Sequence, residues 1–203
     1  MPNVFLIGRP GSGKSLVYKL LSEKLRTRGF QGELKRIDDF PVLKRIFETD
    51  REFKRHRPAP GGGLKITDEG VWDELTDALN QQALKLQSKD RLIFIEFSRG
   101  NYLRAFRRFA PKLLRNSLII YVDSPFELCW ERNVARVRKE KGPDAHLVSK
   151  EEMELTYLHD DHEELAQAGF APMLVIDNRS NDLKKLEAEL ERAADEILKL
   201  IGG

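Results

Sequence analysis

The stretch Gly8–Ser15 carries residue types that bind the phosphates of a nucleotide. It reads GRPGSGKS and matches G-x-x-x-x-G-K-[ST] at every fixed position. In this pattern the glycines let successive backbone N–H groups turn inward around phosphate oxygens. The lysine reaches the outer phosphates, and the last hydroxyl holds a magnesium ion. The sequence therefore predicts a nucleoside-triphosphate site whose binding residues are Gly8, Gly11, Ser12, Gly13, Lys14 and Ser15.

The segments on either side of this loop are those that would position it. Val4–Ile7 is a short apolar run typical of a buried strand. Leucines recur at helical spacing after Ser15 as far as Gly29, which is a suitable C-terminal stop. A helix that begins at the loop points its N-terminus at the phosphates, where its dipole and free N–H groups favour an anion.

Four more strands are predicted along the chain, and each precedes helical sequence. They span residues 33–37, which read ELKRI, and the apolar runs 92–95, 118–122 and 173–176. The pattern predicts an α/β protein with a three-layer P-loop fold, in which a five-stranded parallel sheet has helices on both faces. Ligands of such a sheet gather at the carboxyl ends of its strands. Three carboxylates follow these runs, namely Asp38, Glu96 and Asp123.

Carboxylates at strand ends suit phosphoryl transfer, which needs a metal ion and a residue that orients the nucleophile. Glu96 closes the strand expected beside the loop, so we expect it to hold Mg²⁺ together with Ser15. Asp38 is the candidate base for a substrate hydroxyl, ahead of Asp39. Asp39 and Phe40 are then expected to bind the substrate. A salt-bridged Glu96 and an ordinary Asp-containing turn are the structural alternatives.

Arginines supply the positive charge that phosphoryl transfer also needs. Arg99 follows the third strand, where its planar fork of donors can clamp a substrate oxyanion. Arg132 and Arg136 are four residues apart and therefore share one helix face. We expect this pair to close over the phosphates, with Arg132 binding substrate and Arg136 stabilising the developing charge as a catalytic residue. A solvated basic surface is the alternative.

Two segments interrupt the strand–helix order of this single domain, residues 1–203. Residues 41–66 are basic and contain PAPGGG, which predicts a flexible substrate-binding arm. Residues 130–148 contain the arginine row and a GPD break at 142–144, which predicts a lid. Elsewhere we expect one amphipathic helix through Phe106, Phe109 and Leu113. A second should run from the capping box at Ser149–Glu152 to about residue 165.

The composition limits which classes of protein fit. A chain of 203 residues with a net charge of +2 suits one globular domain and does not favour a nucleic-acid polymer as partner. The single cysteine, Cys129, excludes an internal disulfide and fits a cytoplasmic location. No apolar run reaches membrane-spanning length, so no membrane partner is expected. We assign no chemistry to three histidines expected at the surface, His146, His159 and His162.

The assembled pattern resembles the P-loop small-molecule kinases over most of the chain. The loop GRPGSGK is similar to that of nucleoside monophosphate kinases. The run Asp38–Phe40 resembles the D-D-F or D-S-F element of uridine kinase and nicotinamide riboside kinase, whose first Asp is the catalytic base. The resemblance places that role on Asp38. It also implies ATP and Mg²⁺ as cofactors and a small-molecule substrate, a nucleoside or nucleotide.

The second half of the chain looks most like deoxyribonucleoside kinases. Residues 96–102 read EFSRGNY, similar to their E-R-S and the helix after it, and Cys129–Arg132 matches their C-x-x-R lid sequence. Phe97–Arg99 is also similar to the D-G-F-P-R motif of nucleoside monophosphate kinases, without its Asp-Gly. The Glu-Pro element after the second strand of deoxyribonucleoside kinases is replaced here by DDFP. The resemblance therefore implies the fold and ATP use and leaves the acceptor unassigned.

Functions from three classes compete. The first is a kinase that phosphorylates a hydroxyl of a nucleoside or similar metabolite, or, as its alternative, the phosphate of a nucleoside monophosphate. A regulatory GTPase-like switch would carry N-K-x-D or T-K-x-D after the fourth strand, where the sequence reads YVDS. A motor-type ATPase would place an Asp before Glu96, where Ile95 stands. The arm and the lid favour the kinase, and the sequence leaves a homodimer open.

Overall fold

The computed structural model describes residues 2–60, 62–139 and 147–202, with side chains except at 137–139. Five strands form a parallel sheet in the order β2-β5-β1-β6-β7, which confirms the predicted α/β class. The strands are β1 (Asn3–Ile7), β2 (Glu33–Asp38), β5 (Arg91–Phe97), β6 (Ser117–Asp123) and β7 (Met173–Asp177).

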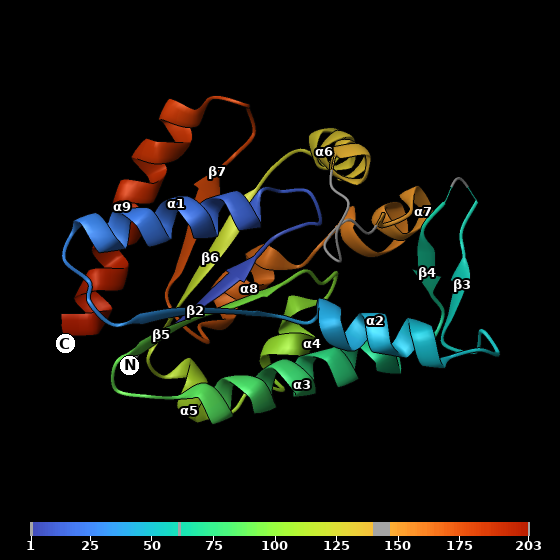
Figure 1. The fold of residues 1–203 in the computed structure, drawn as a ribbon, viewed down its shortest axis with the longest axis horizontal. Coiled ribbons are helices and arrows are strands. Elements are labelled where there is room, and N and C mark those ends of the chain that lie inside the picture. Colours follow the sequence, from blue (N-terminus) through green and yellow to red (C-terminus); the bar gives the residue numbers. More distant parts are fainter. Residues whose placement is uncertain (1, 61, 140–146, 203) are drawn as a thin grey trace.

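Helices cover both faces of this sheet (Figure 1). One face carries α1 (Lys14–Thr27) and α9 (Leu183–Gly202), and the other carries α3 (Gly70–Leu86), α4 (Tyr102–Phe106) and α5 (Pro111–Leu114). Successive strand residues point to opposite faces. Val4 and Leu6 of β1 therefore join the core under α1 and α9, whereas Phe5 and Ile7 join the core on the other side.

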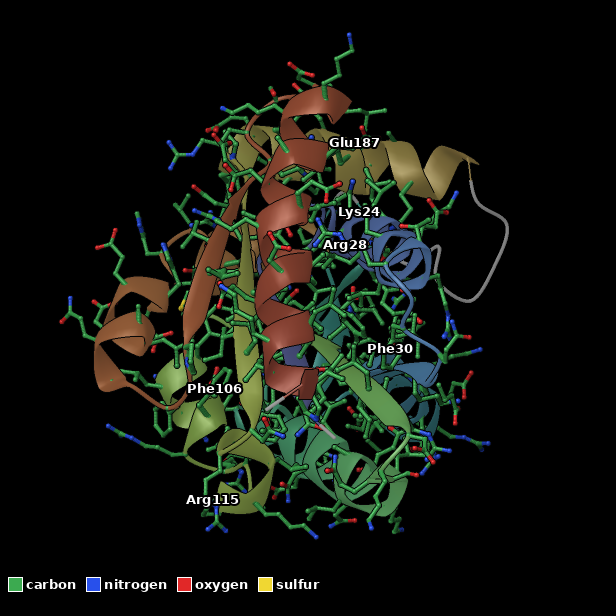
Figure 2. The ribbon with its side chains drawn as sticks, turned by 90° about the vertical axis from the view of Figure 1, so that its left-hand side faces the viewer. Lys24, Arg28, Phe30, Phe106, Arg115 and Glu187 are labelled. Carbon is green, nitrogen blue, oxygen red and sulfur yellow. The ribbon has the colours of Figure 1, made fainter. Side chains whose placement is uncertain are left out.

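The layer formed by α1 and α9 also has charged contacts at its surface. Figure 2 shows Lys24 and Arg28 of α1 beside the long C-terminal helix. Both side chains bond to Glu191 of α9, and Arg28 bonds to Asp195 as well. Exposed ion pairs contribute only about 0–1 kcal/mol each. The leucines buried between the two helices therefore contribute most to holding this layer on the sheet.

The predicted arm contains a helix and a hairpin. They are α2 (Phe40–Thr49) and the antiparallel pair β3 (His56–Pro58) and β4 (Leu64–Ile66), in which His56 lies opposite Ile66. The sequence did not predict this hairpin, because two strands of three residues carry too little alternation to be recognised. Residue 61 of the predicted flexible run lies outside the described residues. The hairpin lies beside α2 at one end of the molecule (Figure 1).

Two helix predictions were wrong in length. The amphipathic helix expected through Leu113 is interrupted, because Pro111 lacks an N–H donor and instead begins α5. The capping box is confirmed, since Ser149 Oγ accepts from the Glu152 N–H at 3.1 Å. However, the chain after it forms three pieces, α7 (Lys150–Glu152), the π-helix η1 (Met153–Tyr157) and α8 (His162–Ala168).

The segment expected to be a lid is described in part. Its first portion belongs to α6 (Phe126–Lys139), while the break at 142–144 and His146 lie outside the described residues. The returning chain meets the arm, because Leu64 of β4 forms a parallel bridge with Val148. None of the described helices is long and apolar enough to cross a membrane.

Candidate active site

A cavity of about 870 Å³ lies at the carboxyl ends of the sheet strands. Its walls include the loop Gly11–Leu16 with part of α6 at one end and the arm at the other. This is the place at which a doubly wound parallel sheet collects its ligands. We call the part lined by Gly11, Lys14, Arg132 and Arg136 the loop end, and the part lined by α2, β4, Trp72 and residues 152–157 the arm end.

The glycines of the loop occupy backbone conformations that other residues rarely adopt. Gly8, Gly11 and Gly13 have φ angles of 142°, 82° and 100°. A Cβ atom at Gly11 would lie 2.1 Å from the carbonyl oxygen of Cys129 on α6, so a side chain would clash there. Gly13 immediately precedes α1, whose first N–H groups consequently face the loop. The loop therefore has the geometry of a phosphate cradle.

Lys14 is buried at the loop end and closes this cradle. Its Nζ donates to the carbonyl oxygens of Gly8 (2.9 Å) and Arg9 (3.0 Å) and to Ser98 Oγ (2.8 Å). Burial lowers the pKa of the Lys14 amine, and the nearby carboxylate of Glu96 opposes this shift. A bound triphosphate would favour the charged form in the same way as the carboxylate does.

Residues distant in the sequence also hold the loop in place. The sequence did not predict these contacts. The Gly8 N–H donates to the hydroxyl of Tyr102 at 3.1 Å. Arg9 donates from Nε to the carbonyl oxygen of Tyr157 at 2.7 Å, and its guanidinium lies 3.5 Å from the Asp160 carboxylate. These partners lie far from the loop in the sequence, and no local motif marks them.

Asp160 has a fully buried side chain and gathers further partners around it. It accepts from the Tyr121 hydroxyl at 2.8 Å, and its other oxygen lies 2.6 Å from Nδ1 of His162. The His162 ring stacks on Tyr121 with centroids 4.1 Å apart. His162, expected at the surface, keeps 24% of its side chain exposed, but the sequence did not predict its contacts with Asp160 and Tyr121. The bond to Asp160 raises the pKa of His162, and burial opposes that shift.

The two carboxylates predicted for metal and base chemistry lie side by side. Asp38 of β2 is paired in register with Glu96 of β5, and both line the cavity. Glu96 also pairs with Nε of Arg36 at 2.8 Å, so the salt-bridge alternative is realised as well. Burial raises the pKa of Glu96, while Lys14 and Arg36 act against the shift. One oxygen of Asp38 accepts from the N–H of Phe40 at 3.0 Å.

Asp39 and Arg99 form an ion pair at 2.6 Å. The Arg99 guanidinium also lies over the rings of Trp72 and Phe97, at 5.4 Å and 5.3 Å from their centroids. Such cation–π contacts hold an arginine in place. The structure therefore joins two predicted substrate-binding residues into one buried unit and adds Trp72, which sequence reasoning did not select. Phe40 lines the same cavity.

The two arginines of α6 both line the cavity, but they contact different groups. Arg132 reaches the loop end, where its guanidinium lies 3.5 Å from the Ser12 carbonyl oxygen and 3.0 Å from Oδ1 of Asn181. Arg136 donates to Oδ1 of Asn133 at 3.1 Å. Arg132 is thus placed beside the nucleotide loop and not beside the arm.

Several cavity residues had no role in the sequence analysis. At the loop end, Asn178 donates to the Ser12 carbonyl oxygen at 2.7 Å. Its position directly after the fifth strand was a usable signal, because ligands gather at strand ends. At the arm end, Glu152 and Tyr157 line the cavity from α7 and η1. Only the tertiary structure brings these two segments to the site.

Comparison with known proteins supports the kinase class. No family model matches the chain. A shikimate kinase from Persephonella marina (strain DSM 14350 / EX-H1) is 30% identical over 138 residues, which are 65% of this chain and 67% of the relative. This likeness lies within the P-loop kinase superfamily, and it does not support the narrower resemblance to deoxyribonucleoside or uridine kinases.

Solved structures share the fold at low sequence identity. Kti12 of Chaetomium thermophilum in complex with ADP-AlF3 is 16% identical, with a TM-score of 0.70 and 100% of each chain covered. A gluconokinase from Sinorhizobium meliloti 1021 is also 16% identical, with a TM-score of 0.52, 98% of this chain and 96% of that chain covered. The relative and the fold together give one conclusion: this chain belongs to the P-loop kinases, in the family that includes shikimate kinase, and is a phosphotransferase.

Proposed function

We propose that this protein transfers the γ-phosphoryl group of ATP to a hydroxyl group of a nucleoside or a similarly sized metabolite. The observation that carries the proposal is the place of Asp38 beside Glu96, in the same cavity as the loop lysine. A hydroxyl acceptor needs a base, whereas a phosphate acceptor is already anionic and does not. A carboxylate at this strand end therefore favours the hydroxyl.

In the proposed reaction the acceptor oxygen forms a bond to the γ-phosphorus, and the bond from that phosphorus to the β–γ bridging oxygen breaks. ADP leaves, and the hydroxyl proton passes to the Asp38 carboxylate. Lys14 and the loop N–H groups bind the phosphates. Arg136 is proposed to stabilise charge on the transferring group, and Arg132 to bind the nucleotide from above the loop. Asp39, Phe40 and Arg99 are proposed to hold the acceptor.

Mg²⁺ fits the donor set at the loop end. Ser15 and Glu96 line the cavity together, and Mg²⁺ in phosphoryl-transfer sites takes one or two protein oxygens besides phosphates and water. Bound there, the ion would neutralise charge on the β- and γ-phosphates. Glu96 must be ionised for this role, and its neighbours Lys14 and Arg36 favour the ionised form.

Residues 41–66 and 130–148 are proposed to act as the acceptor arm and the lid. Closure of both over the cavity would exclude water from the phosphoryl group. The contact between Leu64 and Val148 supports a coupled movement, because it joins the two segments directly. A cytoplasmic location is proposed on the single, buried Cys129.

The test is a panel of acceptors scored for ADP release with ATP and Mg²⁺. It contains nucleosides, their 5′-monophosphates, shikimate and gluconate. The proposal expects release with at least one nucleoside or neutral alcohol and its loss in Asp38→Asn. Release with monophosphates that survives Asp38→Asn would instead assign a phosphate acceptor. Release at one rate with and without every acceptor would favour the regulatory nucleotide-binding alternative.

A further inference from the structure

The arm end of the cavity is walled mainly by apolar and aromatic side chains. They come from α2, β4, α3 and η1 and include Phe40, Phe47, Leu64, Ile66, Trp72 and Tyr157. Trp72 and Tyr157 meet at right angles, with centroids 6.2 Å apart and an interplanar angle of 84°. Arg99 already lies over the Trp72 ring, so a flat apolar group would gain burial and contact with the ring surface that the Trp72–Tyr157 pair leaves uncovered.

The arginines at this end are already neutralised. Arg99 pairs with Asp39 at 2.6 Å, and Arg36 pairs with Glu96 at 2.8 Å. Lys44 lies at the rim with half of its side chain exposed, 3.8 Å from Glu48. A carboxylate or phosphate on the acceptor would have to compete with these protein carboxylates for each arginine.

Among the residues that the structure describes, the remaining cations of the cavity lining belong to the loop end. Arg132 contacts the loop backbone, and Arg136 lies close enough to Lys14 to lower the pKa of that amine. A bound ATP brings its own negative charge to that place, so these three groups serve the triphosphate. They therefore do not supply an anion site for the acceptor.

Glu152 adds a buried carboxyl group to the arm end. Only 5% of the residue is exposed, and its carboxylate accepts from the Ile66 N–H at 3.0 Å and from the Thr156 hydroxyl. Burial raises the pKa of Glu152, and the two hydrogen bonds oppose that shift. In its ionised form it repels an anionic ligand, and in either form it can accept a hydrogen bond from one.

We infer that the acceptor is a neutral or cationic alcohol built on a planar apolar nucleus, and not a carboxylate- or phosphate-bearing compound. The inference rests on the proposed function, because it takes the arm end as the acceptor site. It separates this chain from a kinase of anionic sugars or acids. Burying an anion beside Glu152, where the described arginines of the arm end are already paired with Asp39 and Glu96, would be strongly unfavourable.

Two sets of matched compounds test this inference. The first pairs thymidine with thymidine 5′-monophosphate. The second compares 1,4-benzenedimethanol, 4-(aminomethyl)benzyl alcohol and 4-(hydroxymethyl)benzoate, which share one ring and differ in charge. Binding is followed by tryptophan fluorescence in the presence of a non-hydrolysable ATP analogue, and Trp72→Phe identifies the part of the signal that comes from the cavity. ADP release with ATP is measured on the same compounds.

We expect the neutral and cationic members to bind at least about tenfold more tightly than their anionic counterparts. Equal or tighter binding of the monophosphate and the benzoate would overturn the inference. So would the failure of all five compounds to bind while the ATP analogue still binds. If the neutral members bind but no compound releases ADP, the binding preference is supported and phosphoryl transfer to a hydroxyl is not.

A variant of Glu152 tests whether the charge of this residue contributes to the preference for neutral and cationic compounds. Glu152→Gln keeps one oxygen that can accept from the Ile66 N–H, and its NH2 group can donate to the Thr156 hydroxyl oxygen, while the negative charge is removed. It should narrow the discrimination against the anionic members several-fold. The matched control is Glu151→Gln, because Glu151 pairs with Arg57 and Lys65 outside the cavity lining. Unchanged discrimination in correctly folded Glu152→Gln protein would overturn the role of Glu152 in excluding anions, and so would an equal narrowing of the discrimination by Glu151→Gln.

Discussion

The loop end and the arm end of the cavity recognise their ligands by different means. At the loop end the contacts are expected from backbone N–H groups of one short segment, whose glycines adopt positive φ angles. At the arm end the walls are side chains from α2, β4, α3 and η1, which are up to more than a hundred residues apart. Recognition by backbone groups suits the nucleotide phosphates, which many proteins bind. Recognition by side chains suits the acceptor, which differs from one protein to another.

The two ends differ in charge as well. The loop end gathers Lys14, Arg132 and Arg136, whereas the arginines nearer the arm are paired with carboxylates. This contrast suggests that substitutions at the loop end should affect the rate with any acceptor. Substitutions at the arm end should affect the choice and the affinity of the acceptor. The following predictions test that division, beginning with the largest expected effect.

Lys14→Ala should reduce kcat by several orders of magnitude with every acceptor. Loss of a charge-stabilising group in phosphoryl transfer raises the barrier by on the order of 3–5 kcal/mol. The measurement is steady-state ADP release, with circular dichroism to verify folding. Lys19→Ala is the control, because Lys19 is exposed on the same helix. A near-normal rate in Lys14→Ala would contradict the assignment of the loop end.

Asp38→Asn should lower kcat at least about a hundredfold, the low end of the effect of losing a general base, with little change in the acceptor KM. Arg99→Ala should have the milder effect on kcat, although it leaves the Asp39 carboxylate buried without its partner and should also lower Tm. Both variants are compared at saturating substrate. The reverse ranking would move the assignment from a hydroxyl to a phosphate acceptor.

Trp72→Ala should raise the acceptor KM by about tenfold, which corresponds to about 1.4 kcal/mol of binding, and leave the KM for ATP unchanged. The reason is that Trp72 lines the arm end and supports both Arg99 and Tyr157. Trp72→Phe is the matched control, since it keeps an aromatic face. An equal rise in both KM values would show that the two ends are not independent.

The smallest predicted effect concerns the contacts of Asp160, which pairs with Arg9 of the loop and with His162. Asp160 raises the pKa of His162 in the folded protein. The protonated pair therefore stabilises the folded state fully below the ordinary histidine pKa of about 6.5, and this contribution is lost as the pH rises through the raised pKa. Tm should therefore fall between pH 6 and pH 8.5, by about 2 °C for a partly screened pair. His162→Phe keeps the stacking on Tyr121 and should reduce this part of the pH dependence.

Features that depend on local patterns can be predicted from the amino-acid sequence alone. The loop glycines, the run before them and the helix after them are contiguous, so one motif specifies the phosphate cradle. Four apolar runs and the segment 33–37 predicted the five strands of the sheet, and the rule that ligands gather at strand ends placed Asp38 and Glu96 together. Each of these follows from periodicity or from residues that are neighbours in the chain.

The surroundings of those features depend on the folded chain. Folding pairs Arg36 with Glu96 and Arg99 with Asp39, and it stacks the partly exposed ring of His162 on Tyr121. Charge pairs and ring contacts of this kind join segments that are distant in sequence, so neither partner carries a local signal. The short hairpin and the π-helix belong to the same group. Their residues gain their conformation from the neighbours against which they pack, and not from their own propensity.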